Sequence, residues 1–259
     1  MKSFFKYIIV LLIIPLIFII LIFSLFVFFD KETFLQVLTS ERTFYALKLS
    51  VLTATVVSVI SVVIAIPVSY LLSRKDFYLK SFIDILLEIP LVVSPAALGA
   101  MILIFFNTKF GKYIQNNFIQ IVFSVNGIIF TQFIATIGVA IRLIKSVMDE
   151  IPHRYEDIAR TLGANSLQTF RTIILPLSKN GIFAAFILTW AKCIGEFGAT
   201  MTVAGTTPMH TETLPIAIYL KLSSADIKGS VALILITIII GIASLVTFRY
   251  LKRKSTYYD

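Results

Sequence analysis

Residues 7–29 read YIIVLLIIPLIFIILIFSLFVFF, a run of 23 residues without a charged side chain. An α-helix crosses the hydrocarbon core of a bilayer, about 30 Å thick, with about 20 apolar residues. The run is longer than the apolar core of a signal peptide, which spans about 7 to 15 residues, and it does not end in an A-x-A cleavage site. The stretch therefore predicts a retained transmembrane helix.

Five further apolar stretches meet or nearly meet this length, at about residues 47–72, 82–106, 125–147, 181–203 and 230–250. The composition, 58% hydrophobic and only 14% charged, excludes an ordinary soluble domain and a disordered chain. We therefore expect an all-α, polytopic membrane protein with six transmembrane helices, which form one domain over residues 1–259.

Six spans place both termini on one side of the membrane, and the basic residues indicate which side. In this topology 15 Lys and Arg residues lie with the termini and with the long loop 148–180, 7 lie on the other side, and Lys192 lies within the fifth span. Because Lys and Arg are retained on the cytoplasmic side, the termini and the loop are predicted to be cytoplasmic. The net charge of +9 then has an origin that requires no nucleic acid.

The long loop predicts two short helices outside the membrane, within Asp149–Asn180. Pro152 suits the start of the first helix and Gly163 its end. Ser166 suits the N-cap of the second helix, which Pro176 ends. Each helix carries apolar residues four apart on one face, namely Ile158 with Leu162 and Phe170 with Ile174. Such a hairpin either lies in a groove of a partner or packs on its own membrane domain, and periodicity leaves both open.

Seven residues of this loop follow a fixed spacing, Asp157-Ile158-Ala159, then Gly163, Ile173 and Leu175-Pro176. The spacing resembles the EAA loop of ABC-importer permeases, E-A-A-x3-G-x9-I-x-L-P. Asp157 stands where Glu is usual and Ile158 where the first Ala is usual, which weakens the role of those two positions. The resemblance implies a type I ABC-importer permease fold in which this loop forms coupling helices that dock on a separate cytoplasmic ATPase subunit.

Four further stretches narrow the resemblance: PLVVSP at 90–95, RTLGA at 160–164, GEFGAT at 195–200 and TETLPIAIY at 211–219. They look like the corresponding stretches of molybdate-type permeases, although Ser94 stands where a second proline is common. Sulfate permeases carry a similar Gly-Glu-aromatic-Gly segment, so sulfate, tungstate and other anions remain alternatives.

The molybdate-type resemblance implies a homodimer with the pathway at its interface, two ATPase subunits and an extracytoplasmic oxyanion-binding protein. It also implies a place in the plasma membrane of a bacterium or archaeon, and alternating access as the mechanism. A membrane-embedded enzyme or an assembly factor is the alternative from another class.

Two charged residues, Lys192 and Glu196, lie inside the otherwise apolar fifth span. Four residues apart, they share a helical face, and each is costly in lipid, so both are expected to face protein or a water-filled path. Either they line or gate an anion route, or they form a neutralised pair that fixes helix packing. A carboxylate repels an oxyanion, which makes Glu196 a counter-ion or gate element rather than a ligand.

Small residues and prolines mark two places where a span is interrupted. Gly195, Gly198 and Thr200 allow close approach of helices, and Pro90 and Pro95 break the backbone hydrogen-bond ladder of the third span. These residues are candidates for the translocation pathway or a gate, with ordinary helix packing and a proline kink as the alternative.

No residue pattern predicts catalysis, a metal site or a bound cofactor. The sequence lacks the phosphate loop G-x-x-x-x-G-K-[ST], so we expect ATP to be used by a partner subunit. His153 and His210 are isolated, and the single cysteine, Cys193, excludes a disulfide framework.

Overall fold

The computed structural model describes residues 2–256, and the side chains of residues 12–244 and 246. Residues 1 and 257–259, which the predicted single domain includes, lie outside the described part. All the regular secondary structure of the described residues is helical. The helices are α1 (Lys2–Leu25), α2 (Lys31–Thr39), α3 (Glu41–Arg74), α4 (Lys80–Val92), α5 (Pro95–Asn107), α6 (Lys109–Asn117), α7 (Val125–Asp149), α8 (Arg154–Thr161), α9 (Ser166–Thr169), the π-helical turn η1 (Phe170–Ile174), α10 (Leu175–Ile194), α11 (Gly198–Ala204), α12 (Leu214–Ser223) and α13 (Ile227–Thr256).

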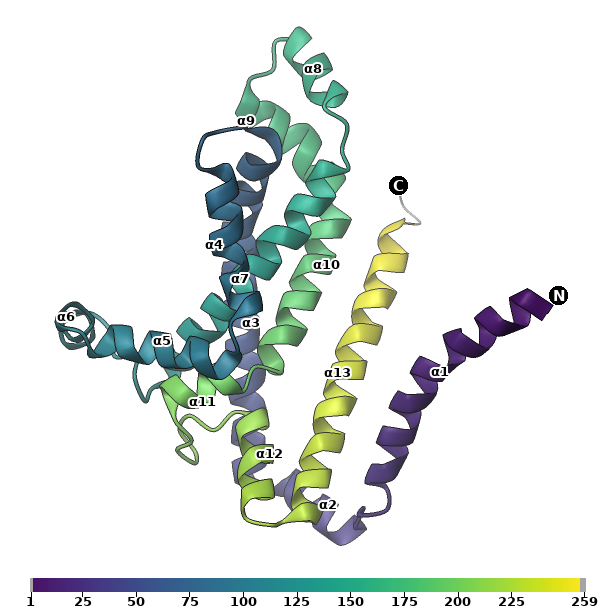
Figure 1. Cartoon of the computed structure of the whole chain (residues 1–259), viewed down its shortest axis with the longest axis vertical. Coiled ribbons are helices and arrows are strands. Elements are labelled where there is room, and N and C mark those ends of the chain that lie inside the picture. The colour runs from purple at the N-terminus through teal and green to yellow at the C-terminus, as the bar shows by residue number, and fades with distance from the viewer. Residues whose placement is uncertain (1, 257–259) are drawn as a thin grey trace.

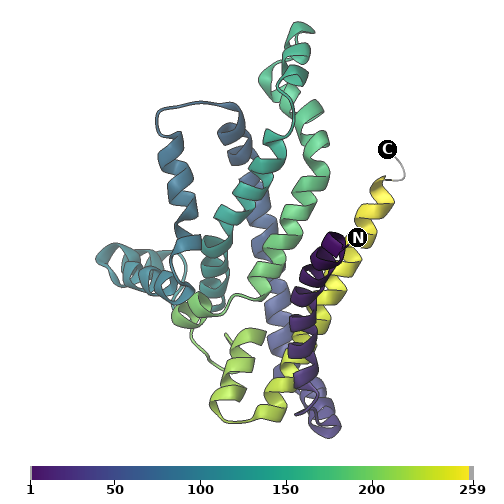
Figure 2. The ribbon, with the colours of Figure 1, turned by 45° about the vertical axis from the view of Figure 1, so that its right-hand side comes forward.

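Figure 1 shows the long helices α3, α7, α10 and α13 running between two ends of the molecule. One end carries α8, and the other carries α2 and the turn between α12 and α13. In Figure 1 helix α5 runs across the long helices with α6 at its outer end, and α1 lies beyond α13, away from the bundle formed by α3, α7 and α10. In the turned view of Figure 2, α1 lies in front of α13.

Four described segments are long and apolar enough to cross a bilayer: Glu41–Arg74, Val125–Asp149, Ser166–Ile194 and Ile227–Ser244. A fifth is added if α4 and α5 are counted as one broken span. The part of α1 whose side chains are described, Leu12–Leu25, is shorter. The expected all-α membrane fold is confirmed, but the expected number of six complete spans is not reproduced by the described residues.

The centre of the bundle is the contact of α3 with α7 and α10. Between apolar helices in lipid, small side chains permit close packing. Helix α3 carries a buried row of them, Ser50, Ala54, Ser58, Ser61, Ala65 and Ser69. Hydrogen bonds fix the register, because the Ser69 hydroxyl donates to the Ile141 carbonyl at 2.9 Å and the Trp190 indole N–H donates to the Thr55 hydroxyl at 3.1 Å.

The predicted third span, 82–106, is not one helix. It divides into α4 and α5, and the chain direction bends by 112° between them. Ser94 has an extended backbone, the conformation that a following proline favours, and Pro95 is the first residue of α5. The Ser94 hydroxyl accepts the Ala97 N–H at 3.3 Å, which caps α5. Pro90 lies inside α4, so Pro95 rather than Pro90 marks the break.

The predicted fifth span, 181–203, is also wrong in its bounds. Helix runs without interruption from Ser166 to Ile194, and a separate short helix, α11, begins at Gly198. Pro176 was expected to end the hairpin's second helix, but it lies at the start of α10. The π-helical turn before it, in which the Leu175 N–H bonds to the Phe170 carbonyl, changes the hydrogen-bond register there. That change lets the proline join the helix.

Candidate functional site

The predicted hairpin is present as residues 154–169, formed by α8, a turn and α9. Gly163 has φ +85°, a conformation that glycine adopts without steric cost. Its N–H donates to the Arg160 carbonyl, and the Ala164 N–H donates to the Ala159 carbonyl. The turn at Gly163 is therefore confirmed, whereas the N-cap of α9 is Asn165 and not Ser166, because Asn165 and Gln168 form a capping box.

The hairpin presents apolar side chains away from the rest of the chain. Leu162 is 83% exposed and Ile158 is 57% exposed, and Leu167 on α9 is also exposed. Asp157 is exposed as well, whereas Ala159 is buried. The hairpin therefore has an inner face that packs on the membrane domain and an outer apolar face that is uncovered.

The inner face is held by Glu156, a residue for which the sequence reasoning assigned no role. Its carboxylate forms an ion pair with Arg74 at the end of α3, and both side chains are only 3% exposed. The Tyr70 hydroxyl donates to Glu156 Oε2 at 3.3 Å, and Arg74 Nη2 donates to the Ile151 carbonyl at 2.9 Å. The sequence did contain one sign that Glu156 is buried: it lies three residues before Ala159 and therefore on the same helical face.

The second half of the seven-residue spacing leads from the hairpin into the bundle. Ile174 is fully buried in the cluster formed by α3, α7 and α10, and Ile173 packs against that cluster. Leu175 is half-buried and Pro176 is exposed. The Tyr70 and Phe170 rings, 4.7 Å apart between centroids, add a contact of η1 with α3. These residues join the hairpin to the membrane domain.

The structure brings together several of the predicted pathway residues where α5 crosses α11. A Cβ atom on Gly198 would lie 3.0 Å from the Pro95 Cβ, and one on Gly99 would lie 2.8 Å from the Thr202 Cβ. Thr200 is fully buried on α11. Pro95 and Gly198 therefore meet where α5 crosses α11, whereas Pro90 lies in α4 one turn before the bend and a Cβ atom on Gly195 would lie near backbone oxygens of α10 alone.

Lys192 and Glu196 are placed differently from the predicted pair. Glu196 is buried, and its Oε1 accepts the Ala199 N–H at 3.0 Å, so the carboxylate binds the first turn of α11. Lys192 is half-buried in the last turn of α10, and Gly195, directly after that helix, is exposed. The described ion pairs do not include one between Lys192 and Glu196.

At the opposite end of the molecule another buried carboxylate, that of Glu212, binds the start of α3, as Glu156 binds its end. Glu212 is buried, and Arg42 Nε lies 2.8 Å from its Oε2. The Leu214 N–H donates to the Ser50 hydroxyl at 2.8 Å, which adds a second link between α3 and the segment before α12. Residues 211–219 belong to the predicted resemblance to molybdate-type permeases, but the sequence alone indicated no role for Glu212.

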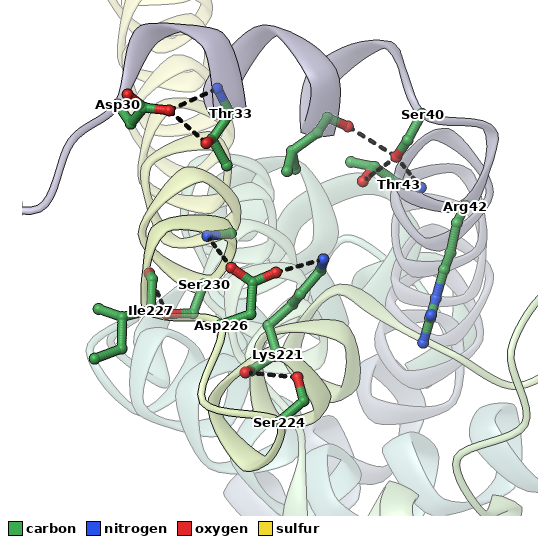
Figure 3. A network of polar contacts seen from close by, with 12 residues as sticks. Asp30, Thr33, Ser40, Arg42, Thr43, Lys221, Ser224, Asp226, Ile227 and Ser230 are labelled. Atoms are coloured by element: carbon green, nitrogen blue, oxygen red, sulfur yellow. Dashed lines mark hydrogen bonds and ion pairs between the residues drawn. The ribbon is translucent and has the colours of Figure 1, made fainter.

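A cavity of about 370 Å³ opens beside this second carboxylate, between α2, α3, α12 and α13. Figure 3 shows the polar side chains around it, with Arg42 on one side and Lys221 and Asp226 on the other. Lys221 Nζ lies 2.7 Å from Asp226 Oδ2. This hydrogen bond, followed by that from the Gly229 N–H, lowers the pKa of the Asp226 carboxyl. The cations in the wall thus already have carboxylate partners.

Among the described residues no group of three His, Cys, Asp or Glu side chains is placed to hold a metal ion.

Residues 59–257 match the family described as "Binding-protein-dependent transport system inner membrane component". The molybdenum transport system permease protein ModB of Haemophilus influenzae is 34% identical over 198 residues, which cover 75% of this chain and 86% of that protein. The sulfate transport system permease protein CysT of Salmonella typhimurium is 27% identical over 200 residues, which cover 76% of this chain and 72% of that protein. A chain in a crystal structure of a bacterial alginate ABC transporter, in complex with a periplasmic protein bound to an alginate pentasaccharide, has the same fold, with a TM-score of 0.76 at 14% identity over 93% of this chain and 88% of that one.

Proposed function

Because the chain belongs to the family of binding-protein-dependent transport system inner membrane components, we propose that it is the membrane-spanning permease subunit of an ATP-driven importer for an oxyanion, molybdate or tungstate. The ModB relative is named for molybdenum transport. Molybdate and tungstate have the same charge and shape, so one pathway serves both. No cofactor is bound by this chain, and ATP is used by its partner.

The observation that carries the proposal is the uncovered apolar face of the hairpin. Ile158, Leu162 and Leu167 are exposed on a segment that projects beyond the transmembrane helices. Apolar side chains four apart on a short amphipathic helix fit a groove in a partner protein. The partner is the cytoplasmic ATPase subunit, and the seven-residue spacing from Asp157 to Pro176 belongs to the coupling loop 148–180.

The orientation in the membrane follows from the distribution of basic residues. With the hairpin in the cytoplasm, both termini are cytoplasmic as well, since α1 begins and α13 ends toward the hairpin end of the molecule. The cavity beside Glu212 then lies on the extracytoplasmic side, where an oxyanion-binding protein delivers the substrate.

The pathway lies at the interface of a homodimer, next to the crossing of α5 and α11. Backbone breaks are not tolerated against lipid, so the break between α4 and α5 is expected to face protein or water. Half-buried Lys192 near this crossing attracts an anion, while Glu196 is occupied with the N–H of Ala199. Binding of ATP closes the ATPase dimer. The hairpin transmits this closure to the spans, so that the pathway opens alternately to the two sides of the membrane.

The proposal is tested by deleting and restoring the gene in its host at limiting oxyanion, with cellular molybdenum, tungsten and sulfur measured by mass spectrometry. We expect a loss of molybdenum or tungsten that the restored gene reverses. Unchanged molybdenum and tungsten would refute the substrate, and unchanged levels of all three elements would refute import of molybdate, tungstate and sulfate.

Sulfate is the second candidate, because CysT, a sulfate permease, matches three quarters of this chain. The same measurement separates it: a reversible loss of sulfur with molybdenum and tungsten unchanged identifies sulfate as the substrate.

A further inference from the structure

Helix α3 is bound at both ends to a buried carboxylate from a distant segment. Near its start Arg42 binds Glu212, which precedes α12, and at its end Arg74 binds Glu156 in the hairpin. The two arginines are 32 residues apart in one unbroken helix, which places them about 48 Å apart. One helix therefore joins the cytoplasmic hairpin to the extracytoplasmic segment beside the cavity.

The two ends differ in how tightly they are enclosed. At the outer end the Arg42 side chain is 48% exposed, and water screens the pair. At the hairpin end both partners are buried, and Glu156 has further contacts, with Tyr70 on α3 and, at 3.9 Å, with Arg160 on α8. The hairpin end is therefore the fixed joint of the two.

A buried ion pair is a poor device for stability alone. Removing two charges from water costs about as much as their attraction returns, and well-packed apolar residues of similar volume often replace such a pair without loss of stability. What the charged pair adds is a defined geometry between two elements. Here these elements are the end of a transmembrane helix and the docking hairpin.

We propose that the Arg74–Glu156 pair is the joint through which movement of the hairpin reaches α3, with Tyr70 as a further positioning residue. This inference rests on the proposed function. When the ATPase subunits close, the hairpin moves α3 with it because Glu156 cannot slide along the helix, and α3 carries the movement to the segment held by Arg42.

The test uses the complete transporter, with ATPase subunit and binding protein, reconstituted in lipid vesicles with molybdate. Two quantities are measured, molybdate taken up and ATP hydrolysed. The double variant Arg74→Met/Glu156→Leu removes both charges and keeps the site filled. We expect it to insert and assemble as the wild type does, and to take up at least threefold less molybdate per ATP hydrolysed.

A matched control is Lys80→Met/Asp76→Leu, which removes an i,i+4 ion pair between the loop after α3 and the start of α4, where the Asp76 side chain is 99% exposed. Its uptake per ATP is expected to equal that of the wild type. Should the Arg74→Met/Glu156→Leu protein fail to accumulate, Tyr70→Phe decides, because it removes only the hydroxyl that binds Glu156. A ratio lowered in Tyr70→Phe supports the joint.

An unchanged ratio in an assembled double variant, or in Tyr70→Phe when that variant decides, overturns the joint. Failure of the proposed function looks different. In that case wild-type vesicles that hold all subunits take up neither molybdate nor any other oxyanion.

Discussion

The docking face of the hairpin gives the sharpest quantitative prediction. The double variant Ile158→Ala/Leu162→Ala removes three carbon atoms from each side chain, and a buried CH₂ contributes about 0.8 kcal/mol. Leu162 is 83% exposed and Ile158 is 57% exposed, so most of this surface is available for a partner to cover. If the partner covers all of it, the truncations cost about 2 and about 1.4 kcal/mol respectively.

Complete coverage by the partner is the upper limit, and coverage of half the surface brings the total to about 1.7 kcal/mol. Since about 1.4 kcal/mol is a factor of ten in Kd, we expect the ATPase subunit to bind the variant about 15-fold to 250-fold more weakly. The assay is the Kd of the purified ATPase subunit for the permease in lipid nanodiscs.

A matched control for this measurement is Leu222→Ala on α12, which is 52% exposed at the opposite end of the molecule. Its Kd for the ATPase subunit is expected to stay within a factor of two of the wild type. Ile158→Ala/Leu162→Ala and Leu222→Ala should both unfold at the wild-type temperature, because the altered side chains are exposed. Equal ATPase binding by the wild type and by Ile158→Ala/Leu162→Ala would refute the assignment of this face.

Three further predictions concern single positions. Gly163→Pro is expected to insert but to lose substrate-dependent ATPase activity in the assembled transporter, because proline fixes φ near −65° whereas Gly163 has φ +85°; retained activity would contradict the coupling role. Ser94→Ala removes the N-cap of α5 and should lower the free energy of unfolding in detergent by about 1 kcal/mol, whereas Ser94→Asn should restore it. Asp226→Asn removes a carboxyl group whose pKa is lowered by the hydrogen bond from Lys221. The stabilising contribution of a lowered pKa is complete above about pH 4 and is lost as the pH falls through the folded-state pKa, so melting temperatures between pH 6 and pH 3 should change less in the variant than in the wild type.

The helical stretches and the hairpin turn were predictable because each depends on local sequence. The charge-free run at 7–29 predicts a helix, and α1 covers most of it. Gly163 ends α8 because a left-handed residue is needed there, which a single glycine signals. These features require no knowledge of distant contacts.

The breaks in the third and fifth spans were less predictable, because hydropathy measures composition and not direction. Residues 82–106 are apolar on both sides of Ser94, so the turn of 112° leaves no trace in mean hydropathy, and two prolines offered two places for it. The fifth span was shifted because Pro176 suggested an end, whereas the π-helical turn before it admits the proline.

The buried carboxylates were not predictable from one sequence. Glu156 and Glu212 lie in polar segments where most acidic residues are solvated, and their partners, Arg74 and Arg42, are 82 and 170 positions away in the chain. Arg74 is one of the 15 Lys and Arg residues predicted to lie on the cytoplasmic side, yet its side chain is 3% exposed. Only the fold brings these pairs together.

The π-helical turn Phe170–Ile174 also determines where the chain can lose a residue. A π turn contains one residue more than the α-helical turn it replaces. Deleting one codon within it would therefore restore a regular α-helical turn, and the hairpin would keep its orientation relative to α10. In the regular part of α10 a single deletion rotates the preceding residues by about 100° instead, which would turn Glu156 away from Arg74. Single-codon deletions are therefore expected to be tolerated more readily at 170–174 than at 180–190, which a growth selection on a codon-deletion library across 166–190 would measure.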